Sequence, residues 1–316
     1  MAEPVDVSGA GRVRPVEPAS SRWQRLRYSD NFWGWLFVLP TVIGILVFAA
    51  GPILAAFAIS LTRWNIVNPP VFVGLDNYQE VVFEQELFWI ALRNTLTYMV
   101  GVIPLQMSVA LLIALALNQG LRYQALFRTL YFLPSVCSTV ALALIWRVLF
   151  DYKLGVLNWF LDLVGLAPVP WLMRPSVAMP ALIIMSAWQG IGYPMVLWLA
   201  GLQGIPQSYY DAAKVDGAGR LALFRHVTWP LLTPTTFFML IIACINSFQV
   251  FEGTYVLTGG GPQRATYTLV FFIYEDAFRN FIMGRASAVA YVLFAFILVL
   301  TVVQLRLQKR WVNYDL

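Results

Sequence analysis

Charged residues are scarce in this chain of 316 residues, of which 12% are charged and 59% are hydrophobic. A soluble domain averages about 25% charged residues, so most of this chain must face lipid or other membrane helices. The net charge of +5 does not indicate nucleic acid as a partner. The basic residues lie at the ends of apolar runs rather than along one stripe, as residues that set membrane topology do.

Residues that bind metals or form disulfides are also few. The two cysteines, Cys137 and Cys244, each lie inside an apolar run, and neither has the spacing of a metal site. We interpret both as small core residues, and we expect no disulfide between them. The single histidine, His226, has no cysteine or carboxylate close to it in the sequence and is interpreted as loop packing. We therefore predict no metal ligand in this chain.

Motifs for nucleotide binding and hydrolysis are absent from the sequence. It contains no GxxxxGK[ST] pattern, so this chain cannot itself be an ATPase of the P-loop type. The Gly-Gly-Gly-Pro run at 259–262 does not fit that pattern and is predicted to be a turn that receives a partner. HExxH, GxSxG and paired intramembrane aspartates are also missing. We predict no catalytic residue and no cofactor in this chain.

Long apolar stretches are what the sequence has in abundance. Crossing a bilayer takes about 20 mostly apolar residues. Six stretches qualify, at roughly 32–60, 88–117, 125–150, 176–202, 231–257 and 281–305. The sequence thus predicts an all-α integral membrane protein with six transmembrane helices.

The lysines and arginines predict how these spans are oriented. Most of the 21 lie in the segments that a six-span topology with both termini in the cytoplasm places inside the cell. Residues 1–30 contain no apolar core and are predicted to be a disordered cytoplasmic segment. Residues 31–316 are predicted to form the membrane domain.

The longest polar interruption in the C-terminal half is the segment 205–230. Residues 208–215 are predicted to form a short helix, and the Asp-Gly-Ala-Gly run at 216–219 predicts a turn. Residues 220–228 are predicted to form a second short helix, which Pro230 stops. Small side chains in the middle of the segment would let the backbone of another protein approach closely.

This pattern resembles the cytoplasmic coupling loop in the permease subunits of binding-protein-dependent ABC importers. The family motif is Glu-Ala-Ala, three residues and then Gly. Asp211-Ala212-Ala213 and Gly217 match it, with Asp211 in place of Glu. The segments at 72–78 and 248–262 resemble the carbohydrate-type, maltose/glycerol-phosphate-like permeases. On this resemblance we assign ATPase coupling to Tyr210, Asp211, Ala212, Ala213, Asp216, Gly217 and Ala218.

The resemblance implies the permease subunit of a type I ABC importer for a sugar, polyol or sugar phosphate, in the prokaryotic plasma membrane. It implies a second homologous permease subunit, two cytoplasmic ATPase subunits that use ATP and Mg²⁺, and an extracytoplasmic solute-binding protein. It also implies alternating access. ATP would draw the coupling helices together and the spans would open outward to accept solute.

Polar residues inside predicted spans are costly and therefore informative. In the fourth span, two glycines and a proline within 188–194 weaken the helix near mid-bilayer, which is a common way to line a substrate cavity. In the fifth span, Asn246, Gln249 and Gly253 are spaced to share one helix face. Amides and aromatic rings suit a sugar, although they also join helix to helix. The resemblance favours a substrate path, and we assign it to Trp188, Gln189, Gly190, Tyr193, Asn246, Ser247, Gln249, Glu252, Ser135 and Ser138.

Two other classes of membrane protein stay open at this point. A six-span secondary carrier would need ionisable coupling groups at mid-depth, and Glu252 is predicted to lie nearer the outer mouth. A non-transporting scaffold subunit would show spans and a docking loop. It would not need the polar residues of the fourth and fifth spans.

Overall fold

The computed structural model describes residues 30–313 of the chain. The chain divides into two compact units, Met1–Ala56 and Phe57–Leu316. Helix α2 (Asp30–Ile45) continues through the π-helical turn η1 (Leu46–Ala50) into α3 (Gly51–Ser60), and the boundary between the two units falls within α3. The stretch Trp33–Ser60 is long and apolar enough to cross a membrane, as predicted. Apart from Asp30, the predicted disordered segment 1–30 lies outside the described residues.

The second unit supplies three further single helices of membrane-spanning length. They are α5 (Glu86–Leu117), the continuous helix Arg220–Phe248 and α16 (Met283–Gln308). Two bent helix pairs qualify as well. They are α6 (Gln124–Val136) with α7 (Thr139–Leu149), and α9 (Pro175–Gly190) with α10 (Gly192–Gly204). If each pair is one span, the described residues hold six, in agreement with the sequence prediction.

Two predicted spans are not the continuous helices that we expected. The third bends by 100° between α6 and α7, two residues beyond Pro134. The fifth ends earlier than predicted, because α13 (Trp229–Phe248) stops and α14 (Glu252–Leu257) starts in a new direction. The prediction that Asn246, Gln249 and Gly253 share one helix face is therefore wrong, since only Asn246 belongs to α13.

Pro230 does not stop a helix, contrary to the sequence prediction. The helix α12 (Arg220–Leu223) runs through the π-helical turn η3 (Phe224–Thr228) directly into α13, so Arg220–Phe248 is one helix of 29 residues. Proline lacks an N–H and its ring crowds the carbonyl four residues earlier. The wider π turn immediately before α13 gives this ring room, because it displaces the preceding carbonyls.

A short hairpin precedes the second span. Strands β1 (Thr62–Arg63) and β2 (Val71–Phe72) pair antiparallel, and α4 (Asp76–Gln79) and the π-helical turn η2 (Glu80–Glu84) follow. The buried amide of Asn77 donates to the carbonyls of Ser60 and Thr62 at 2.7 and 2.9 Å. These bonds attach α4 to the hairpin, which explains the polar phrase at 72–78 in structural terms.

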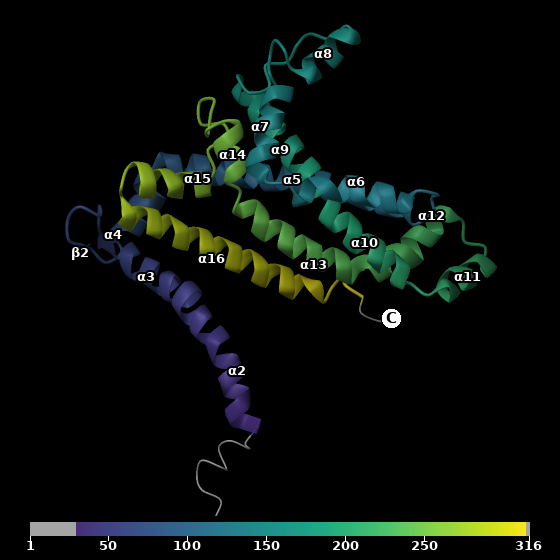
Figure 1. Ribbon diagram of the computed structural model, residues 1–316, viewed down its shortest axis with the longest axis horizontal. Helices are drawn as coiled ribbons and strands as arrows, with labels where there is room; N and C mark the ends of the chain where they lie inside the picture. Colours follow the sequence, from purple (N-terminus) through teal and green to yellow (C-terminus); the bar gives the residue numbers. More distant parts are fainter. Residues whose placement is uncertain (1–29, 314–316) are drawn as a thin grey trace, which may run out of the picture. The chain divides into compact units, whose positions relative to one another are not determined.

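The core of the second unit is built along α5. Buried side chains of this helix belong to three successive apolar clusters, which contain Tyr98, Phe88 and Ala110 respectively. Figure 1 shows α5 running through this unit, with α11 (Gln207–Val215) and α12 at one end and α15 (Leu269–Tyr274) at the other. Cys244 is buried as predicted, but Cys137 is exposed at the bend after α6.

Two smaller helices complete the described chain. Helix α8 (Val156–Leu163) lies between the third and fourth predicted spans. The loop before α16 contains α15 and the π-helical turn η4 (Glu275–Arg279). The two elements are continuous with each other, so the segment between the fifth and sixth predicted spans is partly helical.

Candidate functional site

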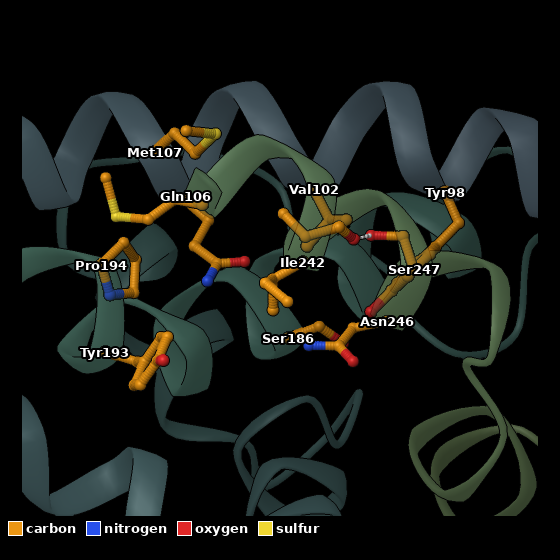
Figure 2. A pocket seen from close by; sticks show the side chains of 12 residues that line it. Tyr98, Val102, Gln106, Met107, Ser186, Tyr193, Pro194, Ile242, Asn246 and Ser247 are labelled. Carbon is orange, nitrogen blue, oxygen red and sulfur yellow. Dashed lines mark hydrogen bonds between the residues drawn. The ribbon is translucent and has the colours of Figure 1, made fainter. Parts of the chain in front are cut away.

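Three helix breaks meet at one polar cavity of about 640 Å³ in the second unit. They are the breaks between α6 and α7, between α9 and α10, and between α13 and α14. The helix α5 closes the cavity on another side, and Figure 2 shows its side chains facing those of α10 and α13. The polar side chains that line the cavity are Tyr98, Gln106, Ser135, Thr139, Ser186, Gln189, Tyr193, Asn246, Gln249 and Glu252.

A second cavity of about 120 Å³ extends this space toward α5. The two cavities share Tyr98, Gln106, Ser186, Tyr193 and Asn246 in their walls, so they form one polar region. The extension also reaches apolar side chains such as Met107 and Met239. The region therefore offers hydrogen-bonding groups together with apolar surface, as a site for a small organic solute does.

Side chains satisfy backbone carbonyls at all three breaks. Gln106 Nε2 donates to the Gly190 carbonyl at 2.7 Å, and Thr268 Oγ1 donates to the Val250 carbonyl at 3.1 Å. Gln189 Nε2 donates to Thr139 Oγ1 at 3.0 Å and to the Cys137 carbonyl at 3.4 Å. Irregular backbone at membrane depth is tolerated where side chains or a cavity supply such partners. These hydrogen bonds stabilise the irregular backbone of the three breaks where it lines the cavity.

The cavity is polar but nearly free of charge. Among the residues that line it, Glu252 is the one acid, and there is no lysine or arginine. The side chains of Asn246 and Gln249 make no hydrogen bond to any residue that the structure describes. Their amides can each donate and accept, so they are available to a solute that carries neutral hydroxyl groups.

Most of the residues that the sequence assigned to a substrate path lie at this cavity. Those that line its larger part are Ser135, Gln189, Gly190, Tyr193, Asn246, Gln249 and Glu252. Ser247 lines the smaller part, and its Oγ donates to the Ala243 carbonyl at 2.7 Å.

Two predicted path residues, Trp188 and Ser138, line neither part of the cavity. Trp188 is 40% exposed and packs edge-on against Trp146, with ring centroids 5.5 Å apart. Ser138 is exposed at the N-terminal end of α7. The structure thus separates these two side chains from the group that the breaks bring together.

Four polar residues of the cavity wall were not predicted from the sequence. Tyr98 and Gln106 lie on α5, Ser186 lies on α9, and Thr139 lies at the start of α7. A signal for Gln106 was present, because it is an uncharged polar residue in the middle of a long apolar helix. Helix α5 stays continuous here, although Gly101 and Pro104 precede this position, so no break marks Gln106.

The segment between α10 and α13 forms a helical hairpin, as the sequence predicts. Helix α11 ends in a Schellman motif, in which the Ala218 N–H bonds the Ala213 carbonyl at 2.9 Å and the Gly217 N–H bonds the Lys214 carbonyl at 3.0 Å. Gly217 has a φ of +82°, which glycine adopts without strain. The hairpin's turn therefore requires glycine where the sequence has it.

The predicted coupling residues differ in exposure. Asp211, Ala212, Asp216 and Gly217 are exposed, whereas Tyr210, Ala213 and Ala218 are half-buried. The Tyr210 hydroxyl lies 3.1 Å from Thr228 Oγ1, which ties α11 to η3. Asp211 accepts from Gln207 and Lys214, and these two hydrogen bonds lower the pKa of its carboxyl group. Tyr210 thus attaches the hairpin to η3, while Asp211, Ala212, Asp216 and Gly217 are exposed to solvent.

The broken spans, the polar cavity between them and the exposed hairpin define a multi-pass helical membrane protein of the permease class. Residues 106–313 match the family described as "Binding-protein-dependent transport system inner membrane component". The chain belongs to this family. It is therefore the membrane component of a prokaryotic import system that works with a binding protein.

Individual relatives agree with this assignment over nearly the whole chain. The chain is 37% identical to the probable ABC transporter permease protein YesP of Bacillus subtilis, covering 90% of this chain and 93% of the relative. It is also 37% identical to the lactose transport system permease protein LacF of Rhizobium radiobacter, covering 90% and 96%.

A crystal structure supports the same fold. It is that of a bacterial alginate ABC transporter in complex with an alginate pentasaccharide-bound periplasmic protein. One of its chains superposes with a TM-score of 0.78 at 24% identity, covering 92% of this chain and 97% of that one.

Proposed function

We propose that this chain forms the solute path of an ATP-driven importer for a neutral sugar or polyol. The observation that carries the proposal is the cavity at the three helix breaks, whose wall is rich in amides and hydroxyls. A sugar needs many uncharged hydrogen-bond partners. A sugar phosphate would in addition need cations, and no lysine or arginine lines this cavity. The name of the lactose relative supports the same class of solute.

The free amides of Asn246 and Gln249 are the main solute contacts in this proposal. They lie on either side of the end of α13, and Gln189 and Tyr193 lie around the break in the fourth span. Tyr193 is half exposed and supplies an aromatic ring, which suits the C–H surface of a sugar. Trp188 and Ser138 do not reach this space, so we propose no solute contact for them.

The hairpin of α11 and α12 is proposed to dock a separate ATPase subunit. Val215 and Leu221 are 88% and 79% exposed, and they lie on either side of the turn that contains the small residue Gly217. Exposed apolar side chains beside small ones suit a protein partner that approaches closely. This docking places the hairpin and both chain termini in the cytoplasm, and ATP and Mg²⁺ bind to the partner.

The remaining partners follow from the exposed surfaces and from the family. Large apolar side chains of α2 and η1, such as Phe37 and Phe48, are exposed and suit lipid or a second permease subunit. A binding protein delivers solute from outside the cell. Closure of the ATPase pair then shifts the spans between the inward-facing and outward-facing states. Solute shifts the equilibrium between these states only because it binds them with different affinities.

Solute-stimulated ATP hydrolysis tests this function. The permease would be purified with its partner permease, ATPase and binding protein, reconstituted in liposomes and exposed to lactose, maltose, trehalose, glycerol and glycerol 3-phosphate in turn. We expect a neutral sugar or polyol to raise hydrolysis several-fold, and glycerol 3-phosphate to have no effect. Stimulation by the phosphate ester alone would refute the neutral-solute assignment.

A further inference from the structure

The Gly190 carbonyl has lost its helical hydrogen-bond donor. In an α-helix this carbonyl would accept from the N–H of residue 194, and residue 194 is proline, which has none. The next backbone bond across the break joins Met195 N–H to the Ile191 carbonyl at 3.1 Å. A buried carbonyl without a partner is costly, so the fourth span carries a gap in its hydrogen bonding at the cavity wall.

Gln106 fills this gap from a different helix. Its Nε2 lies 2.7 Å from the Gly190 carbonyl, and the bond joins α5 to the end of α9 across 84 positions of sequence. Helix α5 is the element around which the three apolar clusters form. The break between α9 and α10 is therefore attached to a helix that contributes buried side chains to all three clusters.

Both glycines at this break have close neighbours, a side chain at Gly190 and a backbone at Gly192. A Cβ on Gly190 would lie 2.6 Å from Gln106 Nε2 and 2.7 Å from its Cδ. A Cβ on Gly192 would lie 2.7 Å from the Phe132 Cα of α6. Gly190 thus admits the Gln106 amide, and Gly192 admits the neighbouring helix. The glycines at the break therefore leave room for a hydrogen-bond donor from α5, namely the Gln106 amide.

We propose that Gln106 is a positioning residue that replaces the donor missing at Pro194 and thereby holds the bend between α9 and α10. The bend, 44° in the structure, sets where Gln189 and Tyr193 stand in the cavity. Gln106 acts on solute through these two side chains. The role of this cavity as a solute path rests on the proposed function. The replacement of the missing backbone N–H by the Gln106 amide does not depend on it.

A pair of substitutions tests the proposal without any solute. Gln106→Met keeps the length of the side chain and removes the donor. Pro194→Ala restores a backbone N–H to position 194. Amide hydrogen exchange of peptides that cover 188–198 would be measured for the two single variants, the double variant and the wild type, in the assembled complex. Ser108→Ala, an exposed position on the same helix, is the matched control.

We expect Q106M to speed exchange in 188–198 about tenfold, which corresponds to one lost hydrogen bond. Peptides of α16 should not change, because the effect is local. In the P194A background the same substitution should change exchange by less than threefold. If Q106M does not accumulate in the membrane, recovery of the Q106M/P194A double variant to the level of P194A would report the same rescue.

Equal effects of Q106M in both backgrounds would overturn the proposal, because the lost donor would then have nothing to do with Pro194. So would unchanged exchange in Q106M. A failure of every sugar to stimulate ATP hydrolysis would count against the proposed function alone, since exchange is measured without solute. The two failures are therefore distinguishable.

Discussion

At the scale of single residues, glycine decides how closely the helices around the cavity approach one another. Gly192 and Gly204 are both on α10 and both have ordinary backbone angles, yet their surroundings differ. A Cβ on Gly192 would meet the backbone of α6 at 2.7 Å, whereas a Cβ on Gly204 would meet nothing within 4 Å. Backbone atoms cannot move aside as a flexible side chain can, so only the first glycine is sterically required.

We expect Gly192→Ala to destabilise the protein by about 1–3 kcal/mol, because it forces α6 and α10 apart. Gly204→Ala should be neutral or slightly stabilising, since alanine favours a helix. Thermal unfolding of the purified variants in detergent would measure both changes. Equal unfolding temperatures for the two variants would show that an added methyl group at position 192 does not force α6 and α10 apart.

Single residues also show how far the site could be predicted from sequence. Gln189 and Asn246 were found because a polar residue in an apolar run is conspicuous. Trp188 was assigned to the path with its neighbours, but it lies on another side of the helix and meets Trp146. Gln106 was missed, because its role depends on a proline 88 positions later, and no local pattern connects the two residues.

At the scale of elements, hydropathy predicted which segments cross the membrane but not where they bend. A bend needs a donor for the freed carbonyls, and here each donor comes from a distant segment, as Thr268 does for Val250. The hairpin turn was predictable because its cause is local, namely glycine at a positive φ in a Schellman motif. The helix that runs through Pro230 shows that a proline alone does not mark an end.

The turn between α11 and α12 allows a test of the proposed docking of an ATPase subunit. Gly217→Ala forces alanine into a φ of +82°, which costs about 1 kcal/mol and distorts the turn. We expect binding of the ATPase subunit to weaken about fivefold, which is the equivalent of that energy. Gly219→Ala is the matched control, because Gly219 has a φ of −75° and open space around it.

Titration of the purified ATPase onto the reconstituted permease pair would measure this affinity. An unchanged affinity in Gly217→Ala would indicate that the ATPase does not sense the shape of this turn. A loss of equal size in Gly219→Ala would indicate that any added methyl group interferes, whatever the backbone conformation.

A buried ion pair joins three elements at the other end of the second unit. Arg285 of α16 bonds Asp276 of η4 through two nitrogens, at 2.7 and 2.9 Å, and bonds Glu80 of η2 at 2.7 Å. The Asp276 side chain is 2% exposed. Removing Asp276 would leave Arg285 with the more exposed Glu80 as its partner and would leave two buried guanidinium N–H groups without an acceptor, which is more costly than losing an exposed pair.

We expect Asp276→Ala to destabilise the protein by about 3 kcal/mol. Lys214→Ala, which removes the exposed pair with Asp211, should cost less than about 1 kcal/mol. Chemical unfolding of both variants, followed by tryptophan fluorescence, would separate them. If Asp276→Ala proved as mild as Lys214→Ala, the ion pair would not hold α16, η2 and η4 together.

At the scale of the whole molecule, the fold connects the polar cavity to the hairpin of α11 and α12 through one continuous helix. The helix Arg220–Phe248 begins at the hairpin and ends at the break beside Asn246. A movement imposed at one end therefore reaches the cavity without crossing a flexible joint. The sequence predicted polar residues at one end of this helix and the hairpin at the other, but the predicted stop at Pro230 hid the continuous helix between them.

Uptake of a labelled sugar into proteoliposomes that hold the complete complex tests the central claim most directly. The sugar would be the one that stimulates ATP hydrolysis, and Asn246→Leu would be compared with Ser108→Val, a substitution at an exposed position of α5 outside the cavity. We predict that Asn246→Leu lowers uptake at least tenfold while the complex still assembles, and that Ser108→Val leaves uptake unchanged. Undiminished uptake by Asn246→Leu would contradict the assignment of this cavity as the solute path.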